Sequence, residues 1–443
     1  MTSTTVNSDM GQAQVALPLE AVAPGMKSRM EPGKLSAVAN GLLGVGILCV
    51  LVTLITYLAG GGEHAEGAHA GEAAGGHAGE HVSTSKQAAM SYITSFSYGL
   101  GLALGALFFV MVQHITRAGW SVLVRRVAEN LMGVLSPWMI VLFVPIVFMA
   151  SDIYHHWWHY HAAPGEEGYD SILSGKLAYL NPTFWYIRAA IYLGIWAALA
   201  RFFRNASLKQ DETGDPALTT KMAGRAAPGL AAFGLTLTFA AVDWIMTIDP
   251  HWYSTIFGLT FFGGAVVSML ALTTLIILFV QKKGYLKEIN SEHFHDLGKL
   301  MFAFMVFWTY VNFSQYMLIW YANVPEETLW YQHRKAWEGT FALLSVGHFL
   351  VPFAFLMSRH MKRNKLTLAF ASLWLLTMHW FDMQFVIMPD IHHDGIHPSW
   401  LDAVSMIGVV GVIVGATLRN IGNSPLIPER DPRLKESLHF HNV

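Results

Sequence analysis

Ten apolar segments, each long enough to cross a membrane as a helix, alternate with polar connections along the chain. A hydrocarbon core about 30 Å thick needs about 20 apolar helical residues. The hydrophobic share of 53% and charged share of 13% are typical of a polytopic membrane protein. We therefore predict an all-α integral membrane protein with ten transmembrane helices. The predicted spans are 35–60, 88–113, 127–150, 181–203, 226–247, 253–280, 300–322, 336–358, 366–388 and 399–418.

Positive charges are segregated between the two sides of these spans. Of the 28 Lys and Arg residues, 23 fall on the side that holds both termini and four on the other side, and Arg188 alone lies deep within a span. Lys and Arg are enriched in the cytoplasmic connections of membrane proteins. The distribution therefore predicts that both termini are cytoplasmic. The net charge of −2 says nothing about partners, because the charge is segregated rather than balanced.

A short internal repeat in the sequence predicts that eight of the spans form two copies of a four-helix unit. Asp243 and Pro250 end the fifth span with six residues between them, and Asp382 and Pro389 end the ninth in the same way. Four helices separate the two, so both copies have the same orientation. The alternative is that this short match between the two spans is a coincidence.

The chain is predicted to consist of seven parts. They are 1–34, a cytoplasmic N-terminal segment; 35–60, a peripheral helix; 61–87, a His/Gly/Ala-rich outer loop; 88–252 and 253–390, two four-helix bundles (spans 2–5 and 6–9); 391–420, the last, peripheral helix with its outer loop; and 421–443, a cytoplasmic tail.

Polar and ionisable side chains inside the spans mark the candidate site, because each is costly in hydrocarbon unless it is paired or hydrated. With a rise of about 1.5 Å per helical residue, they gather in the outer half of five helices. We expect them to line one polar cavity that opens outward and accepts or relays the protons of a quinol. No residue is assigned as firmly catalytic. The candidates for quinone binding or proton transfer are Arg188, Asp243, Asp249, Asn312, Gln315, Tyr316, His348, His379 and Asp382.

A purely structural role is the alternative for these residues. Asp243 and Asp382 could be helix-end residues that meet water, and Arg188 could pair with either carboxylate. Two features favour the shared cavity. His379 and Asp382 are three residues apart, so they share one helix face. An arginine beside a carboxylate keeps the carboxylate ionised and able to accept a proton.

Cysteine and histidine counts limit the cofactors. Cys49 is the only cysteine, which excludes a Cys-ligated iron–sulfur cluster, a CxxCH haem attachment and an intrachain disulfide. A transmembrane b-type haem needs opposed histidines on two helices, and only His348 and His379 qualify. A single-haem b cytochrome therefore stays an alternative, whereas two stacked haems are excluded. We expect no covalently bound cofactor.

Thirteen of the 21 histidines lie in predicted outer loops. Clustered histidines can bind Zn or Cu. The Gly/Ala spacing of the run at 61–82 gives no fixed ligand geometry and indicates a low-complexity insert. The clusters at 151–161 and 390–397 adjoin tryptophans, which favours an interfacial belt or docking surface. We therefore assign no metal ligand. The thirteen are His64, His69, His77, His81, His155, His156, His159, His161, His251, His333, His392, His393 and His397.

Three long strings of sequence carry a family resemblance. They are FAFMVFWTYVNFSQYMLIWYANVPEETLWY (302–331), AAVDWIMTIDPHWYSTIFGL (240–259) and HWFDMQFVIMPDIHHDG (379–395). In these strings the chain resembles the second NrfD-like (polysulfide-reductase-type) membrane subunit of bacterial alternative complex III, the subunit described as quinone-binding subunit 2 of a quinol:cytochrome c oxidoreductase. The similarity extends over about 35–420 and leaves out the first 34 residues and the insert at 61–85.

The resemblance implies a multi-pass subunit of the bacterial cytoplasmic (inner) membrane. Its expected partners are an iron–sulfur subunit, c-type haem subunits, a paralogous membrane anchor and the lipid bilayer, with no nucleic acid. Haem and iron–sulfur clusters would reside on those partners, and quinol or quinone would be the ligand here. Asp243, Asp249, His379 and Asp382 carry over as polar-cavity residues.

The expected function is support of quinol oxidation, proton transfer or both, within a complex and not by this chain alone. One alternative is a scaffold subunit without its own quinol site. Another, from a different class, is a secondary transporter. The sequence argues against a transporter because it lacks Gly/Pro-broken helix pairs at matching midplane positions.

Overall fold

The computed structural model describes residues 27–31, 33, 35–60 and 82–442. Most of the predicted N-terminal segment 1–34 and of the His-rich loop 61–87, including His64, His69, His77 and His81, lies outside the described residues. Within them the protein is helical and contains no β-strand, which confirms the predicted all-α class. The long helices are α2 (Ser36–Gly60), α4 (Thr84–Ile115), α6 (Trp138–Ile153), α8 (Pro182–Thr213), α9 (Ala217–Trp244), α10 (Phe257–Lys282), α11 (Ser291–Ala322), α16 (Lys365–Ile387) and α17 (Trp400–Asn423).

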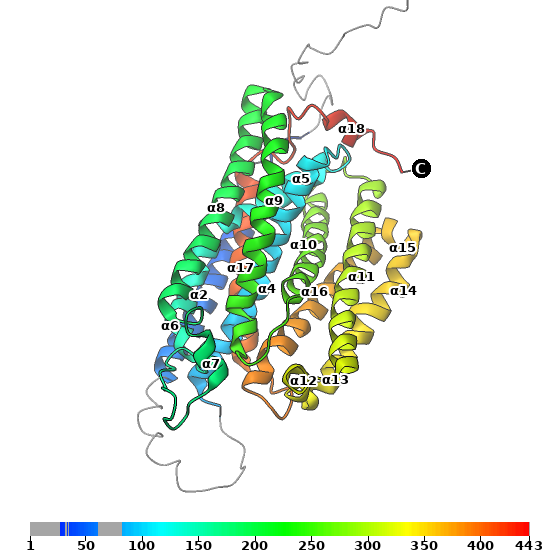
Figure 1. Ribbon diagram of the computed structural model, residues 1–443. Coiled ribbons are helices and arrows are strands. Elements are labelled where there is room, and N and C mark those ends of the chain that lie inside the picture. The colour runs from blue at the N-terminus through cyan, green and yellow to red at the C-terminus, as the bar shows by residue number, and fades with distance from the viewer. Residues whose placement is uncertain (1–26, 32, 34, 61–81, 443) are drawn as a thin grey trace, which may run out of the picture.

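Shorter helices complete or connect these elements. They are α5 (Val122–Met132), η1 (Gly133–Leu135), α7 (Ser171–Lys176), η2 (Met246–Ile248), α12 (Pro325–Gln332), η3 (Lys335–Trp337), α13 (Glu338–Leu343), η4 (Leu344–Leu350), α14 (Val351–Met357), α15 (Arg359–Arg363), η5 (Met388–Asp390) and α18 (Leu434–Leu438). The end of the molecule that carries α7 and α12 is called the α12 end, and the opposite end is called the α18 end (Figure 1).

Eight helical stretches of the described residues are long and apolar enough to cross a membrane. The predicted spans at 300–322 and 366–388 are also helical, as α11 and α16, but these two helices are not among the eight. The polar side chains that make α11 and α16 candidates for a site also lower their mean hydropathy. A multi-pass membrane protein is therefore supported, and the count of ten spans stays a prediction.

Helices α4 and α10 form the centre of the molecule. The apolar stretch of α4 is 89% buried and that of α10 is 83% buried, against 17% for α2. The two central helices approach closely because Gly105 has no side chain: a Cβ there would lie 2.6 Å from the carbonyl oxygen of Ala265. Helices α6, α8 and α9 group around α4, and α11 and α16 pack on α10, with α14 against α11 and α16 (Figure 1). We call these the first and second helix groups.

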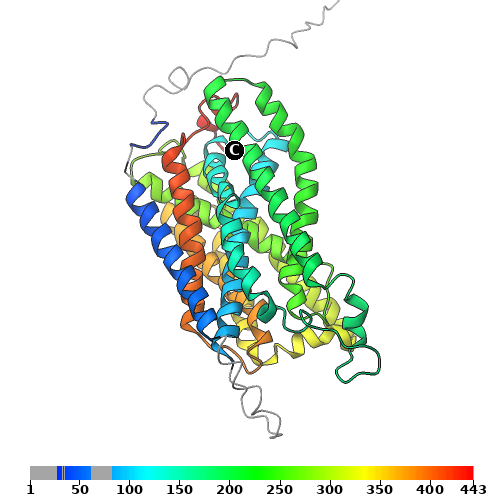
Figure 2. The same cartoon turned by 90° about the vertical axis from the view of Figure 1, so that its left-hand side faces the viewer.

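Helices α2 and α17 pack along each other at one edge of the molecule (Figure 2). Small residues allow their backbones to meet. A Cβ on Gly46 would lie 2.6 Å from the backbone nitrogen of Val412, and one on Gly415 would lie 2.8 Å from that of Leu43. Close backbone approach through small residues is the usual way in which transmembrane helices associate.

Local sequence signals set the ends of several long helices. The side chains of Asn181 and Asn364 accept hydrogen bonds from first-turn backbone N–H groups of α8 and α16, which otherwise lack partners. Gly214 and Asn323 end α8 and α11 in the left-handed conformation, with φ of 69° and 48°. Gly and Asn are the residues that adopt this conformation most readily.

Two predicted spans are less regular than the sequence indicates. The predicted span 127–150 lies within one of the eight stretches, Val122–Ile153, but η1 and the extended residue Ser136, just before Pro137, separate α5 from α6. Proline has no N–H to donate and disfavours helical backbone in the residue before it. The predicted span 336–358 contains the π-helical segment η4, where the indole nitrogen of Trp374 donates to the carbonyl of Gly347 at 2.6 Å.

A buried ion cluster at the α18 end was not predicted. The Arg125 guanidinium donates to Glu129 at 3.1 Å and to Asp431 at 2.5 Å, and Arg126 donates to Asp211 at 2.5 Å. All five side chains are at most 5% exposed. The cluster ties the C-terminal segment to α5 and α8. The predicted spans end at 113 and begin again at 127, and so leave Arg125 and Arg126 in a connection.

The C-terminal segment also packs on a buried histidine. The His293 Nε2 atom lies 3.3 Å from the Ser437 hydroxyl, and its Nδ1 lies 2.9 Å from the Asn290 side-chain oxygen. Burial lowers the pKa of His293 to about 4, because the imidazolium form loses its hydration. An exposed histidine titrates near pH 6.5. Between about pH 4 and 6.5 the released or unfolded state therefore binds more protons than the docked state. The docked state has its full stability above about pH 6.5 and becomes less stable as the pH falls.

We therefore expect the segment around α18 to loosen as the pH is lowered from about 6.5 toward 4. A nitroxide label at Asn442→Cys, in a Cys49→Ser background, should become more mobile over this range. In His293→Gln, which cannot take up the proton, that change should disappear. The same label at Thr213→Cys serves as the control. Equal pH responses with and without His293 would contradict the assignment.

Candidate functional site

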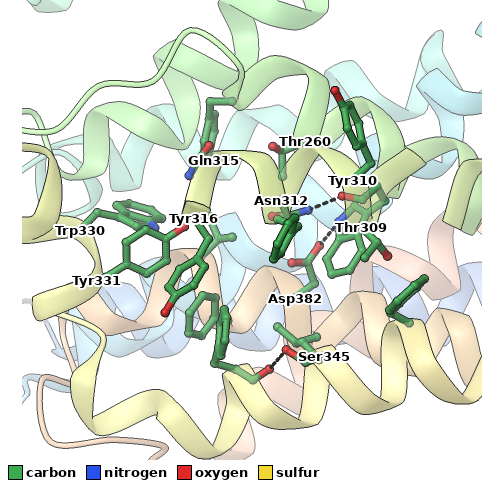
Figure 3. A pocket seen from close by; sticks show the side chains of 18 of the residues that line it. Thr260, Thr309, Tyr310, Asn312, Gln315, Tyr316, Trp330, Tyr331, Ser345 and Asp382 are labelled. Carbon is green, nitrogen blue, oxygen red and sulfur yellow. Dashed lines mark hydrogen bonds between the residues drawn. The ribbon is translucent and has the colours of Figure 1, made fainter. Parts of the chain in front are cut away.

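A cavity of about 530 Å³ lies in the second helix group near the α12 end (Figure 3). Helices α10, α11, α12, α13 and α16 and the π-helical η4 supply its walls. Aromatic side chains dominate the lining, and this volume and lining are typical of sites for small ring-shaped ligands. The aromatic lining residues are Phe257, Trp308, Tyr310, Phe313, Tyr316, Trp330, Tyr331, Phe341, Phe349 and Phe385.

The cavity opens on the side of the molecule. Its most exposed aromatic and aliphatic lining residues are Tyr310 (66%), Phe313 (59%) and Leu350 (54%). They lie on α11 and η4, along the lengths of the helices rather than at the loops. The short helix α12 covers the cavity toward the α12 end with Trp330 and Tyr331.

Asp382 on α16 places an acidic group in the cavity wall. Its Oδ2 accepts a hydrogen bond of 3.1 Å from the indole nitrogen of Trp308 and lies 3.3 Å from Nδ1 of His379. The side chain is 5% exposed. Within the described residues, His379 is the only basic side chain within 4.0 Å of this carboxylate. No arginine or lysine of the described residues therefore forms an ion pair with Asp382.

Two buried histidines stand behind the cavity wall. The rings of His348 and His379 lie 6.3 Å apart between centroids, and His348 packs 3.9 Å from Trp308. Both are at most 1% exposed, and no ring nitrogen of either has a hydrogen-bond partner among the described residues. The side chains of His348, Trp308, His379 and Asp382 thus form a contiguous set that ends at the cavity.

Polar groups on α11 and α12 complete the cavity. The Asn312 amide donates to the carbonyl of Trp308 at 2.9 Å, and the Gln315 side-chain oxygen accepts from Ser254 at 3.1 Å. In the view of Figure 3, Asn312 lies beside Asp382, whereas Gln315 and Tyr331 lie toward α12. Burial raises the pKa of Tyr331 to about 12, so its phenol remains a proton donor at neutral pH.

The first helix group holds a closed ion pair. The Asp243 carboxylate accepts four hydrogen bonds: from Arg188 Nε at 2.6 Å and Nη2 at 3.2 Å, from Tyr179 at 2.7 Å and from Tyr192 at 2.8 Å. The guanidinium carbon of Arg188 lies 3.9 Å from the Tyr179 ring centroid and 4.3 Å from that of Phe184. Every acceptor position on the carboxylate is used. Arg188 and Asp243 thus pair with each other and do not line the cavity beside Asp382.

The structure divides the nine candidates into three sets. Asn312, Gln315, Tyr316 and Asp382 line the cavity, and His379 and His348 stand behind it. Arg188 and Asp243 form the separate pair in the first group. Asp249 lies in the loop after η2, 3.5 Å from Nδ1 of His333, and does not line the cavity.

Sequence reasoning missed several contributors. Tyr192 lies four residues after Arg188 on α8, a spacing that puts both on one helix face and could have revealed it. Trp308 likewise lies four residues before Asn312. Arg334 gave no such signal: its Nε and Nη2 donate to the carbonyls at 385 and 386, at 3.1 and 2.7 Å, and these contacts exist only in the folded chain.

Comparison with known proteins does not place the chain in a family. No protein-family model matches the sequence, and no curated protein matches it either. The fold and the site together define an all-helical, multi-pass membrane protein with a buried carboxylate beside a laterally open cavity. Its function is therefore argued from that site.

Proposed function

We propose that the chain is a membrane subunit of a respiratory quinol:electron-acceptor oxidoreductase and that the cavity beside Asp382 is its quinol site. The observation that carries the proposal is the uncompensated carboxylate in the wall of an aromatic-lined cavity of about 530 Å³. A quinol headgroup is a flat ring with two hydroxyl groups. Aromatic walls suit the ring, and the carboxylate and amide oxygens suit the hydroxyls.

Oxidation of a quinol to a quinone releases two protons and two electrons. Asp382 would accept a hydroxyl proton as a general base, and the indole N–H of Trp308 would stabilise the ionised carboxylate beforehand. His379, whose Nδ1 is 3.3 Å from Asp382, would take that proton onward, and Asp382 would then accept the second hydroxyl proton. The electrons would pass to a partner subunit, since Cys49, the single cysteine, cannot hold an iron–sulfur cluster.

The proposed setting is the bacterial cytoplasmic membrane, with ten spans and both termini cytoplasmic. The charge distribution and the three strings that resemble the second NrfD-like subunit of alternative complex III support this setting. The α12 end would then face outward, toward an iron–sulfur subunit and c-type haem subunits, with a paralogous anchor alongside in the membrane.

Two alternatives are less well supported by the packing. A haem between His348 and His379 would need an open slot, but these rings pack 3.9 Å from Trp308 and 5.3 Å from Tyr98. A transporter with matched broken helices would need a counterpart to the break at η1, whereas α11, four spans further on, is continuous. A scaffold role stays open, and ligand binding separates it from the proposal.

The first test combines purification with ligand labelling. The tagged chain, taken from native membranes in mild detergent, should co-purify with c-type haem and an iron–sulfur protein. A photoreactive quinone should label α11 to α13, and Ser345→Trp, at the cavity wall, should abolish the labelling. Thr377→Trp, at an exposed position of α16 outside the cavity, is the matched control. Undiminished labelling of Ser345→Trp would show that the cavity is not the quinol site. A chain that purifies without partners would contradict the assignment to a respiratory complex.

A further inference from the structure

Two segments far apart in the sequence meet at the α12 end and bring together three side chains with metal-binding chemistry. His155 and His156 lie in the turn after α6, and Asp390 is the last residue of η5. Their potential ligand atoms all lie within 4.8 Å of one another. His156 Nε2 is 3.2 Å from Asp390 Oδ1, and His155 Nδ1 is 4.0 Å from Asp390 Oδ2. We infer that these residues form a binding site for a divalent transition-metal cation such as Zn²⁺.

Two of the atoms in this cluster are buried and lack hydrogen-bond partners: Nδ1 of His155 and Oδ2 of Asp390. The Asp390 side chain is only 10% exposed. A buried polar atom without a partner destabilises the folded state. Because the two atoms face the same space, 4.0 Å apart, a cation between them would supply the missing partner of both.

The donor set suits zinc. In a tetrahedral site with bonds of about 2.0–2.1 Å, neighbouring ligand atoms lie roughly 3.3 Å apart. The observed 3.2 and 4.0 Å separations require only small movements of the imidazoles. The neutral form of an imidazole is the form that binds metals. Two imidazoles and one carboxylate leave the fourth position to water.

The ammonium group of Lys86 competes with the metal for the ring of His155. Its ammonium nitrogen lies 3.3 Å from Nε2 of His155. When the ammonium group donates to Nε2, the ring proton of neutral His155 is on Nδ1, and that nitrogen is then not a ligand. Metal binding requires the opposite tautomer, so the partly exposed lysine has to turn toward water. Removing this lysine should therefore strengthen metal binding.

The site would join the two helix groups. His155 and His156 follow α6 of the first group, and Asp390 follows α16 of the second. His156 and Asp390 are 234 positions apart, and the neighbouring tryptophans favoured a belt or docking surface, so the sequence did not predict that the two segments meet. A bound cation would hold these two chain segments together at the α12 end.

The test is zinc binding to the full-length protein in detergent, after treatment with a chelator, measured by calorimetry and metal analysis. The background carries alanine at the four histidines of the 61–82 run, so that this run does not contribute. One zinc site is expected, with affinity at least about tenfold weaker in His156→Ala and in Asp390→Asn and stronger in Lys86→Met. His360→Ala, an exposed histidine at the α18 end, is the matched control.

X-ray absorption of the bound zinc should show two imidazole ligands and oxygen. Unfolding temperatures without zinc establish that each variant folds. Zinc affinity unchanged in both His156→Ala and Asp390→Asn would overturn the assignment, as would loss of all binding on removal of the 61–82 histidines. The result does not depend on the quinol proposal, because no quinol is used and none of the three ligands lines the cavity.

Discussion

Replacing Asp382 with asparagine is expected to lower quinol turnover by at least about 100-fold, because a positioned general base contributes roughly 10²–10⁴-fold. Asparagine has nearly the same shape and keeps an oxygen for the indole N–H of Trp308, 3.1 Å away. The cavity should therefore stay intact, and the complex should still assemble. The amide, however, cannot take up a proton, so binding of quinol is retained while its oxidation slows.

Turnover and quinol binding are measured on the same purified complex, and the pH profile is recorded for both forms. The matched control is Asp243→Asn, the same substitution at the equivalent position of the internal repeat, in the first helix group. Since all acceptor positions of Asp243 are occupied within the protein, that variant should keep its turnover per folded complex. If the Asp382→Asn complex turned over quinol as fast as the wild type, Asp382 would not be part of the quinol site.

The second large effect is expected on stability. Arg188→Met should lower the free energy of unfolding by about 3–5 kcal/mol, because removal of one partner of a buried ion pair leaves the other charge without compensation. Arg188 is 7% exposed and Asp243 is 1% exposed, so water does not replace the lost guanidinium. Tyr179 and Tyr192 continue to donate to the carboxylate but carry no positive charge.

Unfolding by SDS in mixed micelles gives this free energy. The double variant Arg188→Met/Asp243→Asn should recover much of the loss, since the amide is neutral. Its oxygen accepts from one tyrosine and its NH2 group donates to the hydroxyl oxygen of the other. No recovery would mean that packing of the guanidinium against Tyr179 and Phe184, rather than charge, is what the arginine contributes. A normal stability combined with lost turnover in Arg188→Met would instead assign Arg188 to function.

The helices were largely predictable because their signals are local. Apolar runs of spanning length, caps such as Asn181 and Asn364, and stop residues such as Gly214 all act within a few positions of the chain. The break at Pro137 had a signal in the sequence, but the apolar residues on both sides of it masked that signal. Local patterning therefore predicted where helices lie better than how regular they are.

The site was predictable only as a set of residue types and depths. Sequence depth placed Arg188, Asp243 and Asp382 together in one half of the membrane, but depth says nothing about position in the plane of the bilayer. In the structure, Arg188 and Asp243 close on each other in the first group, and Asp382 lies in the second. Helix packing between distant parts of the chain determines which carboxylate pairs with Arg188. No local sequence pattern predicts that pairing.

The sideways opening of the cavity, bordered by the exposed rings of Tyr310 and Phe313, has a consequence for supply. A ligand that reaches Asp382 by this route arrives from the lipid phase by diffusion in two dimensions. Under the proposed function, the concentration that governs turnover is then the mole fraction of quinol among the lipids, not its amount per volume of water. The long isoprenoid tail can stay among the acyl chains while the ring alone enters, so headgroup chemistry and tail length become separable variables.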